Sequence, residues 1–185
     1  MTKPCTILGI DPGTNLLGFG VVRVVESGKP EFEDMGVLDI RKEKDPYAKL
    51  ARISEFVGGL CESYHPDHMA IESPFLDKNA QVIFKLGRAQ GAAMVAASAH
   101  GVEITEYAPR KAKIAICGNG SASKQQVSAM VQKTLGIKIE ESHLDATDAL
   151  AIAMCHYYQL SSPLTSAGQG GSWAKFIKDN PDRVK

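Results

Sequence analysis

Four acidic residues occur in segments whose neighbours allow few conformations. Asp11 ends a short apolar run and is followed at once by a Pro-Gly pair, and Glu72 ends a second apolar run that is followed by Ser-Pro. This pattern predicts two β-strands that each stop at a carboxylate. Asp145 and Asp148 lie three residues apart in an alanine-rich segment, which places both on one face of a helix. The chain must therefore present acidic groups at two strand ends and on one helix.

These acids are chemically informative because carboxylates are seldom buried without a partner. Four carboxylates that converge on one point repel each other strongly unless a cation lies between them. Oxygen ligands without Cys or His at metal-binding spacing suit Mg²⁺ or Mn²⁺ rather than zinc. Two such ions about 3.5–4 Å apart can activate a water and stabilise a leaving oxygen in phosphodiester cleavage. The pattern therefore favours metal-assisted phosphoryl chemistry, with Asp11 placed to bridge the ions.

The composition is that of a globular chain. Of 185 residues, 44% are hydrophobic and 23% are charged, which fits one domain with a core of its own. The four cysteines are scattered and form no CxxC pair, so we expect reduced thiols. The N-terminus has no apolar secretory core, and no run approaches the ~20 apolar residues that cross a bilayer. These features predict a cytoplasmic protein.

The net charge is zero, but its distribution is uneven. Residues 25–77 carry twelve acidic and six basic residues, whereas residues 78–124 carry seven basic residues and two acidic ones. A basic face that binds a polyanion explains this asymmetry. A solvated surface that is basic for other reasons explains it equally well, so charge alone leaves both readings open.

Periodicity and turn residues predict an α/β domain with a mixed five-stranded sheet. The first three strands are joined by short turns and should form an antiparallel meander, while a helix before the fourth strand makes that strand parallel to the first. This domain is expected at 1–160, and the Ser-, Gly- and Pro-containing segment 161–185 is expected to be a flexible C-terminal tail. The strands are expected at 5–11, 18–25, 32–40, 68–72 and 102–107, and the helices at 45–64, 79–100, 109–116, 123–135 and 143–160.

Six ordered motifs resemble those of one family, the RuvC Holliday-junction resolvases. The resemblance runs from about residue 6 to residue 157. The first motif alone also opens other ribonuclease-H-like domains and sugar kinases, but six blocks in the same order are specific. The motifs are GIDPGT with GFGV, IESPF with KN, KLGRAQG, YAPR, GNGSASK and DATDALAIA.

The resemblance implies a ribonuclease-H-like fold of the retroviral-integrase superfamily. It implies a homodimer that cuts four-way DNA junctions by paired symmetric nicks, with two Mg²⁺ ions in each active site and Mn²⁺ as a substitute. The RuvA–RuvB branch-migration complex is the implied partner. Carried over by motif, the metal ligands and catalytic acids are Asp11, Glu72, Asp145 and Asp148. The helix at 79–100, rich in small residues, is our candidate for the dimer interface.

The same resemblance implies a set of DNA contacts. Phe75 corresponds to a residue that stacks on unpaired junction bases, although a loop Phe packed into the core is the alternative. Lys113 and Lys124 correspond to lysines that face the DNA, and either can contact the scissile phosphate or flanking backbone; Lys124 is counted with the catalytic residues. The remaining candidate DNA-binding residues are Lys78, Lys85, Arg88 and Arg110.

Three other functions are compatible with part of this pattern. Actin-like sugar kinases and ATPases share the first motif, but they usually carry a duplicated domain and a second phosphate loop. A non-catalytic junction-binding relative would lack some of the four acids, which are all present here. A related ribonuclease-H-like nuclease acting on other nucleic acid would keep the acids without the Phe75 motif.

Overall fold

The computed structural model describes residues 3–74, 80–139 and 144–162, with only the backbone of residues 144 and 145. Its five strands form one mixed sheet in the order β3-β2-β1-β4-β5. β1 pairs antiparallel with β2 and parallel with β4, and β4 pairs parallel with β5. The strands are β1 (Cys5–Asp11), β2 (Leu16–Val24), β3 (Pro30–Asp39), β4 (His68–Glu72) and β5 (Glu103–Tyr107).

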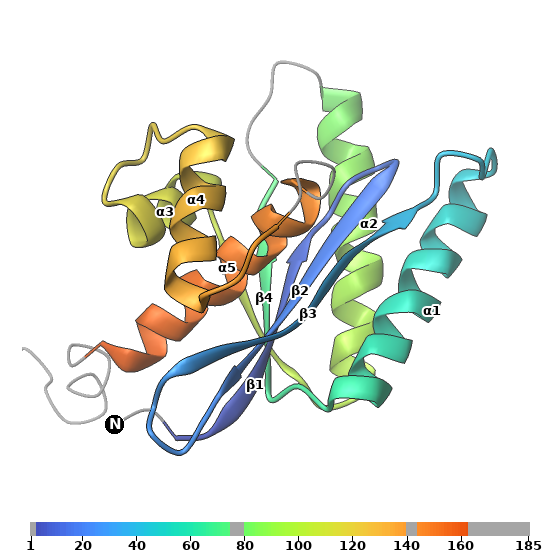
Figure 1. Ribbon diagram of the computed structural model, residues 1–185. Coiled ribbons are helices and arrows are strands. Elements are labelled where there is room, and N and C mark those ends of the chain that lie inside the picture. The colour runs from blue at the N-terminus through green and yellow to red at the C-terminus, as the bar shows by residue number, and fades with distance from the viewer. Residues whose placement is uncertain (1–2, 75–79, 140–143, 163–185) are drawn as a thin grey trace, which may run out of the picture.

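Five helices cover the two faces of this sheet. Helices α1 (Pro46–Tyr64) and α2 (Ala80–Ala99) lie on one face. Helices α3 (Pro109–Cys117), α4 (Lys124–Leu135) and α5 (Leu144–Ser161) lie on the other (Figure 1). The predicted mixed sheet is confirmed, and every described boundary lies within two residues of its predicted position.

Local sequence explains where the helices begin. Asp45 accepts a hydrogen bond from the backbone amide of Ala48 and so caps α1, which starts at a proline. Ser123 caps α4 through a reciprocal capping box with Gln126. Both cap residues were predicted as the first helical residue, and each instead precedes its helix by one position.

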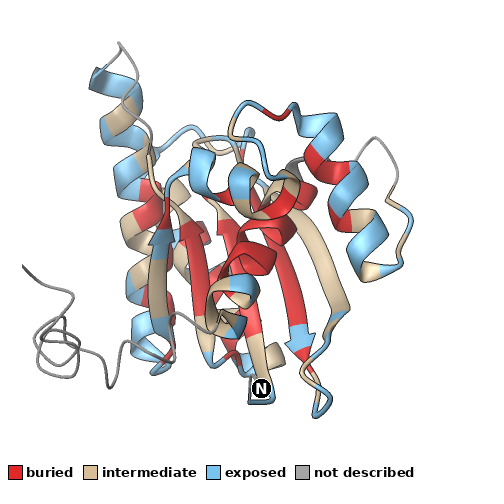
Figure 2. Ribbon diagram, turned by 90° about the vertical axis from the view of Figure 1, so that its left-hand side faces the viewer, coloured by how far each residue is buried: buried red, intermediate tan, exposed pale blue. Residues whose placement is uncertain are grey.

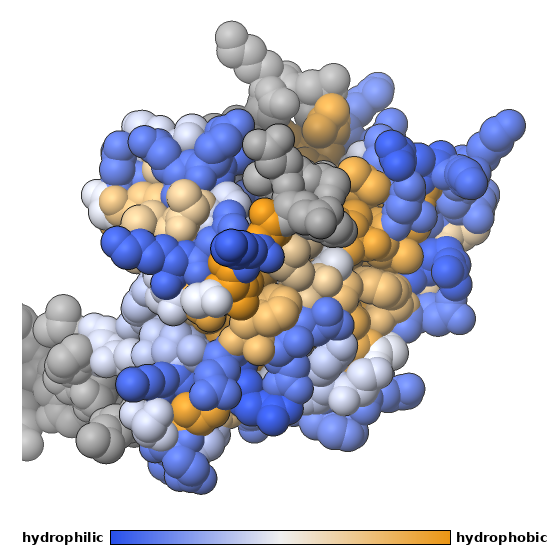
Figure 3. Space-filling model, in the orientation of Figure 1, coloured by the Kyte–Doolittle hydropathy of each residue, from blue (hydrophilic) through white to orange (hydrophobic). Residues whose placement is uncertain are grey.

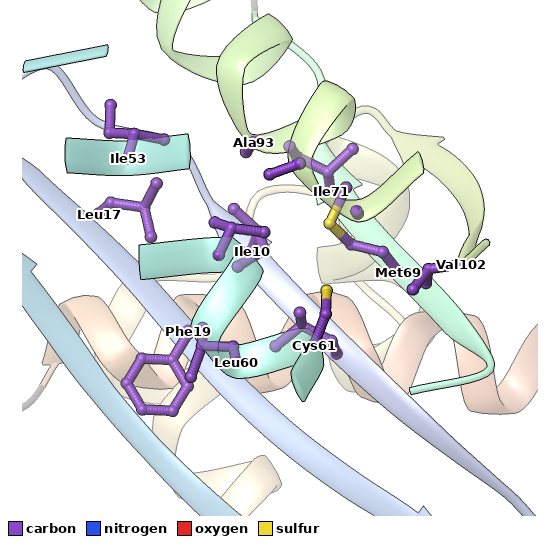
Figure 4. Packing of buried hydrophobic residues seen from close by; sticks show 14 of the residues in the cluster. Ile10, Leu17, Phe19, Ile53, Leu60, Cys61, Met69, Ile71, Ala93 and Val102 are labelled. Atoms are coloured by element: carbon purple, nitrogen blue, oxygen red, sulfur yellow. The ribbon is translucent and has the colours of Figure 1, made fainter. Parts of the chain in front are cut away.

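Alternation along the strands divides the core in two. Leu8, Ile10 and Ile71 face α1 and α2, where they join the cluster shown in Figure 4. Ile7 and Ala70 face α3, α4 and α5. Since side chains alternate along a strand, the residues that end β1 and β4, at positions 11 and 72, point toward α5. In Figure 2 the buried residues occupy the central strands and the inner faces of the helices.

The sheet and α5 approach each other unusually closely. Gly9 of β1 pairs with Gly20 of β2, and a Cβ at either position would overlap α5: its backbone at Gly9, and the Leu150 side chain at Gly20. Because these two glycines have no side chains, α5 can pack directly against the backbones of β1 and β2.

The edge of the sheet at β3 is partly apolar. Strand β3 is a sheet edge with half-buried apolar side chains, and Figure 3 shows this apolar surface between hydrophilic surfaces over α1 and over α3 and α4. Among the described residues, no helix combines the length and apolar character that crossing a membrane requires.

Candidate active site

The ends of β1 and β4 bring two carboxylates together. Ile10 and Ile71 are the last pair in the parallel register of these strands, and Asp11 and Glu72 each follow by one residue. Adjacent strands lie about 4.8 Å apart, so the two acids leave neighbouring strands on the same face. The structure thus brings these two acids into one cavity, while their role as metal ligands stays a prediction.

Helix α5 supplies a third carboxylate. Asp148 is partly buried, between the fully buried residues Thr147 and Ala149. It lines the same cavity as Asp11 and Glu72. Asp145 lies three residues earlier, in the first turn of α5. Because its side chain is outside the description, its convergence with the others stays a prediction.

The three carboxylates line an open cavity of about 280 Å³ together with two lysines, Lys113 from α3 and Lys124 from α4. Apolar side chains form the remaining walls. These apolar residues were not predicted from the sequence. Most of them lie three or four positions from Lys113, Lys124 or Asp148, a helical spacing that would have placed them on the same face. They are Pro109, Ala112, Val127, Ala151 and Ile152.

The raised pKa of Glu72 indicates that the cavity has too little positive charge to balance its carboxylates. Burial, together with the negative charges of Asp11 and Asp148, raises the pKa of Glu72 from its ordinary value to about 7. Lys124 and Lys113 oppose this shift but do not cancel it. A bound cation would lower the pKa of this carboxyl and restore its charge.

One lysine already occupies part of the site. The ammonium Nζ of Lys124 lies 2.5 Å from the carboxylate Oδ2 of Asp148. Lys124 is the first residue of α4, directly after the capping box of Ser123, so its backbone position is fixed. In this arrangement Lys124 pairs with the carboxylate of Asp148.

The site partly fits a divalent ion. Hard oxygen donors and the elevated pKa of Glu72 suit Mg²⁺. However, within the described residues no three Asp, Glu, His or Cys side chains are gathered closely enough to hold a metal. The side chain of Asp145 is not among those considered, and the ammonium of Lys124 competes for Asp148. An ion bound by Asp148 would compete with the ammonium of Lys124 for that carboxylate.

The other predicted DNA contacts are not all brought to this cavity. Lys85 and Arg88 line a separate cavity between α1 and α2. Arg110 packs across Gly120, where a Cβ would lie 2.7 Å from its Cγ. Phe75 and Lys78 lie outside the described residues. The structure thus distributes the candidate DNA contacts over more than one surface.

A mixed sheet with helices on both faces, and acids at the ends of β1 and β4 opposite α5, defines the class of ribonuclease-H-like proteins. The family model described as "Crossover junction endodeoxyribonuclease RuvC" matches residues 7–156. The chain belongs to this family.

Individual relatives agree with this assignment. The crossover junction endodeoxyribonuclease RuvC of Bacteroides fragilis is 51% identical over 99% of this chain and 97% of its own length. The structure of Thermus thermophilus RuvC superimposes with a TM-score of 0.73 at 34% identity, covering 83% of this chain and 95% of the other. The T. thermophilus protein in complex with a Holliday junction substrate gives 0.75 at 30% identity, covering 85% and 96%. The predicted family and ribonuclease-H-like fold are confirmed.

Proposed function

We propose that this chain resolves four-way DNA junctions by hydrolysing phosphodiester bonds in the cavity that Asp11, Glu72 and Asp148 line. The single observation that carries the proposal is the meeting of these acids with Lys113 and Lys124 in one cavity. Family membership makes the chain a crossover junction endodeoxyribonuclease. The proposal adds which residues perform the reaction.

The carboxylates provide the ligands for divalent metal. Asp11 and Glu72 stand on rigid strand ends, Asp148 stands on α5, and Asp145 is the proposed fourth ligand. We assign two Mg²⁺ ions to the site, with Mn²⁺ as a substitute; when bound, they supply Lewis-acid activation of water and charge stabilisation on the phosphate. Glu72 must be deprotonated to bind metal, and its raised pKa makes that step dependent on pH.

The lysines complement the phosphate. Lys113 and Lys124 place two positive charges in the cavity wall, where the negative phosphate oxygens of a scissile group would lie. If Asp148 served as a metal ligand, the ammonium of Lys124 would be released from that carboxylate and could donate to a phosphate oxygen. This exchange links substrate binding to the assembly of the site.

Paired nicks in strands of like polarity require two sites related by a two-fold axis. We assign the interface to α2. Its residues Phe84 and Val95 are 71% and 69% exposed, and a Cβ at Gly87 or Gly91 would meet nothing within 4 Å. These glycines therefore make no close packing contact with the residues that the structure describes. Their open surface, beside two exposed apolar side chains, is suited to contact with a second copy of this chain.

The cellular setting follows from the family and the cysteines. The four cysteines are free thiols, which supports action in a reducing cytoplasm. A RuvA–RuvB branch-migration complex is the proposed partner, on the family resemblance alone.

Incubation with a synthetic four-way junction tests the proposal. Junctions labelled on each strand in turn should show paired nicks in the presence of Mg²⁺ and intact strands in EDTA. A linear duplex of the same sequence is the matched control and should be cut far more slowly. Replacing Asp11 with Asn, or Glu72 with Gln, should reduce cleavage by orders of magnitude while junction binding persists, because acidic repulsion of phosphate is relieved. Loss of binding together with cleavage in a folded variant would contradict the metal-site assignment.

A further inference from the structure

A second cavity, of about 400 Å³, lies between the first turns of α1, the start of α2 and the loop that follows β1. It shares no lining residue with the active-site cavity. Lys85 and Arg88 in its wall are candidate DNA contacts, but the other lining residues have no assigned role. The inference below rests on the proposed function.

The cavity is strongly cationic. Four basic side chains line it, Lys44, Lys49, Lys85 and Arg88, and among the residues that the structure describes no Asp or Glu does. The acids nearest to Lys44 in sequence are engaged elsewhere: Glu43 accepts from the backbone amide of Asp45, and Asp45 accepts from that of Ala48. Like charges gathered in one concavity destabilise it unless an anion binds between them.

The cavity adjoins the loop that follows Asp11. Thr14 and Asn15 in its wall follow Asp11 by three and four residues. The Cα atoms of Asp11 and Thr14 are therefore at most about 11 Å apart. A DNA strand advances about 3.4 Å along the duplex axis for each nucleotide, so the spacing corresponds to roughly three nucleotides.

One lysine fixes this loop. The ammonium Nζ of Lys49 donates to the carbonyl oxygen of Thr14 at 3.1 Å and to Oδ1 of Asn15 at 3.0 Å. Lys44, Lys85 and Arg88 form no ion pair with any residue that the structure describes. Three cations are thus available to an incoming anion, and the fourth holds the wall in place.

The floor of the cavity is apolar. Ile40, Leu50, Ile53 and Ala89 form it, and Tyr47 at the rim is 73% exposed. A cationic rim over an apolar floor suits a nucleotide unit, with its phosphate on the cations and its sugar or base against the floor. Inorganic ions alone would leave the apolar floor and the tyrosine unused.

We propose that this cavity binds a backbone phosphate of the junction strand, a few nucleotides from the scissile phosphate. Because the Asp11–Asn15 loop joins the two cavities, binding here sets the position of the strand over the carboxylates. The cavity is a positioning site, and its residues do not take part in the chemical step.

Substitution of the two exposed lysines tests the site. Lys44→Gln with Lys85→Gln removes two charges and leaves the Lys49 contacts intact. Lys29→Gln, an exposed lysine in the turn between β2 and β3 at the opposite end of the sheet, is the matched control. In EDTA, the double variant should bind a labelled four-way junction about tenfold more weakly at 0.1 M salt. The slope of log K against log salt should become shallower by about one to two, and Lys29→Gln should change neither.

A scan of neutral methylphosphonates along the cleaved strand locates the contact. With wild-type protein, one position a few nucleotides from the cut should weaken binding several-fold, and the double variant should lose nothing further at that position. Independent, additive losses at every position would overturn the proposal. So would saturable binding of thymidine monophosphate that the double substitution abolishes while junction binding stays unchanged, because the cavity would then hold free nucleotide.

The cleavage assay separates this proposal from the proposed function. If wild-type protein cuts the junction and the double variant binds it normally, only the second cavity is wrongly assigned. If wild-type protein neither binds nor cuts the junction in Mg²⁺, the proposed function fails, and this inference fails with it.

Discussion

Gly9 of β1 lies directly against the backbone at Ala149 of α5: a Cβ on Gly9 would come within 2.1 Å of the carbonyl oxygen of Ala149. Ala149 follows Asp148, and Gly9 precedes Asp11 by two residues. The strand and the helix that carry two of the proposed catalytic acids, Asp11 and Asp148, therefore touch through their backbones. Their separation is set without any intervening side chain that could change rotamer.

Replacing Gly9 with Ala should destabilise the protein by at least about 3 kcal/mol, because the added methyl group overlaps helix backbone that can yield only by moving α5. The melting temperature should fall by roughly 6–12 °C. Gly59→Ala is the control: a Cβ at this position in α1 meets nothing within 4 Å, so the change should be neutral or stabilise by up to about 1 kcal/mol. Equal melting temperatures for both variants would contradict backbone contact at Gly9.

Glu72 should make the metal-free protein less stable as pH rises. Its folded pKa of about 7 exceeds the ordinary value of 4.5, so the folded state binds more protons between these values. The free energy of unfolding then decreases from pH 4.5 to 7, by at most about 3 kcal/mol from this group. Urea unfolding of wild type and Glu72→Gln should diverge over this range, with the variant the more stable at pH 8.

Mg²⁺ provides the complementary measurement for Glu72. Since metal binds the deprotonated carboxylate, Mg²⁺ should raise the melting temperature of wild type more at pH 8 than at pH 5. Glu72→Gln should show a smaller rise at pH 8. An equal effect of Mg²⁺ at both pH values would count against Glu72 as a ligand.

His156, in contrast to Glu72, should make the folded protein more stable as pH rises. It is buried in α5 with its Nδ1 2.8 Å from the Tyr107 hydroxyl, and burial lowers its pKa to about 4, helped by the nearby charges of His68 and Lys111. The neutral form is therefore favoured in the folded state. Its stability contribution is complete above pH 6.5 and is lost as pH falls toward 4.

The test for His156 is a comparison with His156→Gln, which keeps a hydrogen-bonding side chain and removes the titration. The difference in unfolding free energy between the two proteins should shrink, by up to about 3 kcal/mol, as pH falls from 6.5 to 4. Because Glu72 titrates in the opposite sense over part of this range, wild type alone would show a misleadingly flat curve. A difference in unfolding free energy that stays constant over this pH range would show that folding does not lower the pKa of His156.

The sequence predicted this fold well because its local signals agree with one another. Asp45-Pro46 and Ser123 with Gln126 mark helix starts by capping chemistry that needs no tertiary contact. Asp11 and Glu72 could be placed on one edge because parallel strands end together. The second cavity could not be foreseen, because Lys44 and Lys85 are far apart in the sequence and meet only when α1 packs against α2. Likewise, no sequence pattern gave the contact between Lys124 and Asp148.

A charge on the exposed face of α2 that carries Phe84, Gly87, Gly91 and Val95 should prevent dimerisation. Val95 is 69% exposed in the monomer, so Val95→Glu should leave folding intact while it places a charge in the proposed interface. Sedimentation at micromolar concentration should show a dimer for wild type and a monomer for the variant, with paired nicking reduced to single, uncoordinated nicks. Met130→Glu, at a 39% exposed position on α4, is the control and should remain dimeric. A wild-type monomer that still cuts both strands rapidly would remove the interface.

Phe75 should act on DNA and contribute little to stability. A ring that stacks on a junction base contributes about 1–3 kcal/mol to binding, so Phe75→Ala should reduce junction cleavage without a marked change in melting temperature. Phe75→Tyr and Phe75→Trp should retain much of the activity, because each keeps an aromatic face. A core phenylalanine behaves differently: truncation to Ala costs about 3–5 kcal/mol of stability, and Trp is poorly accommodated. Thermal melting and junction cleavage of the three variants separate these cases, and a large loss of stability with normal activity in the folded fraction would reject the stacking role.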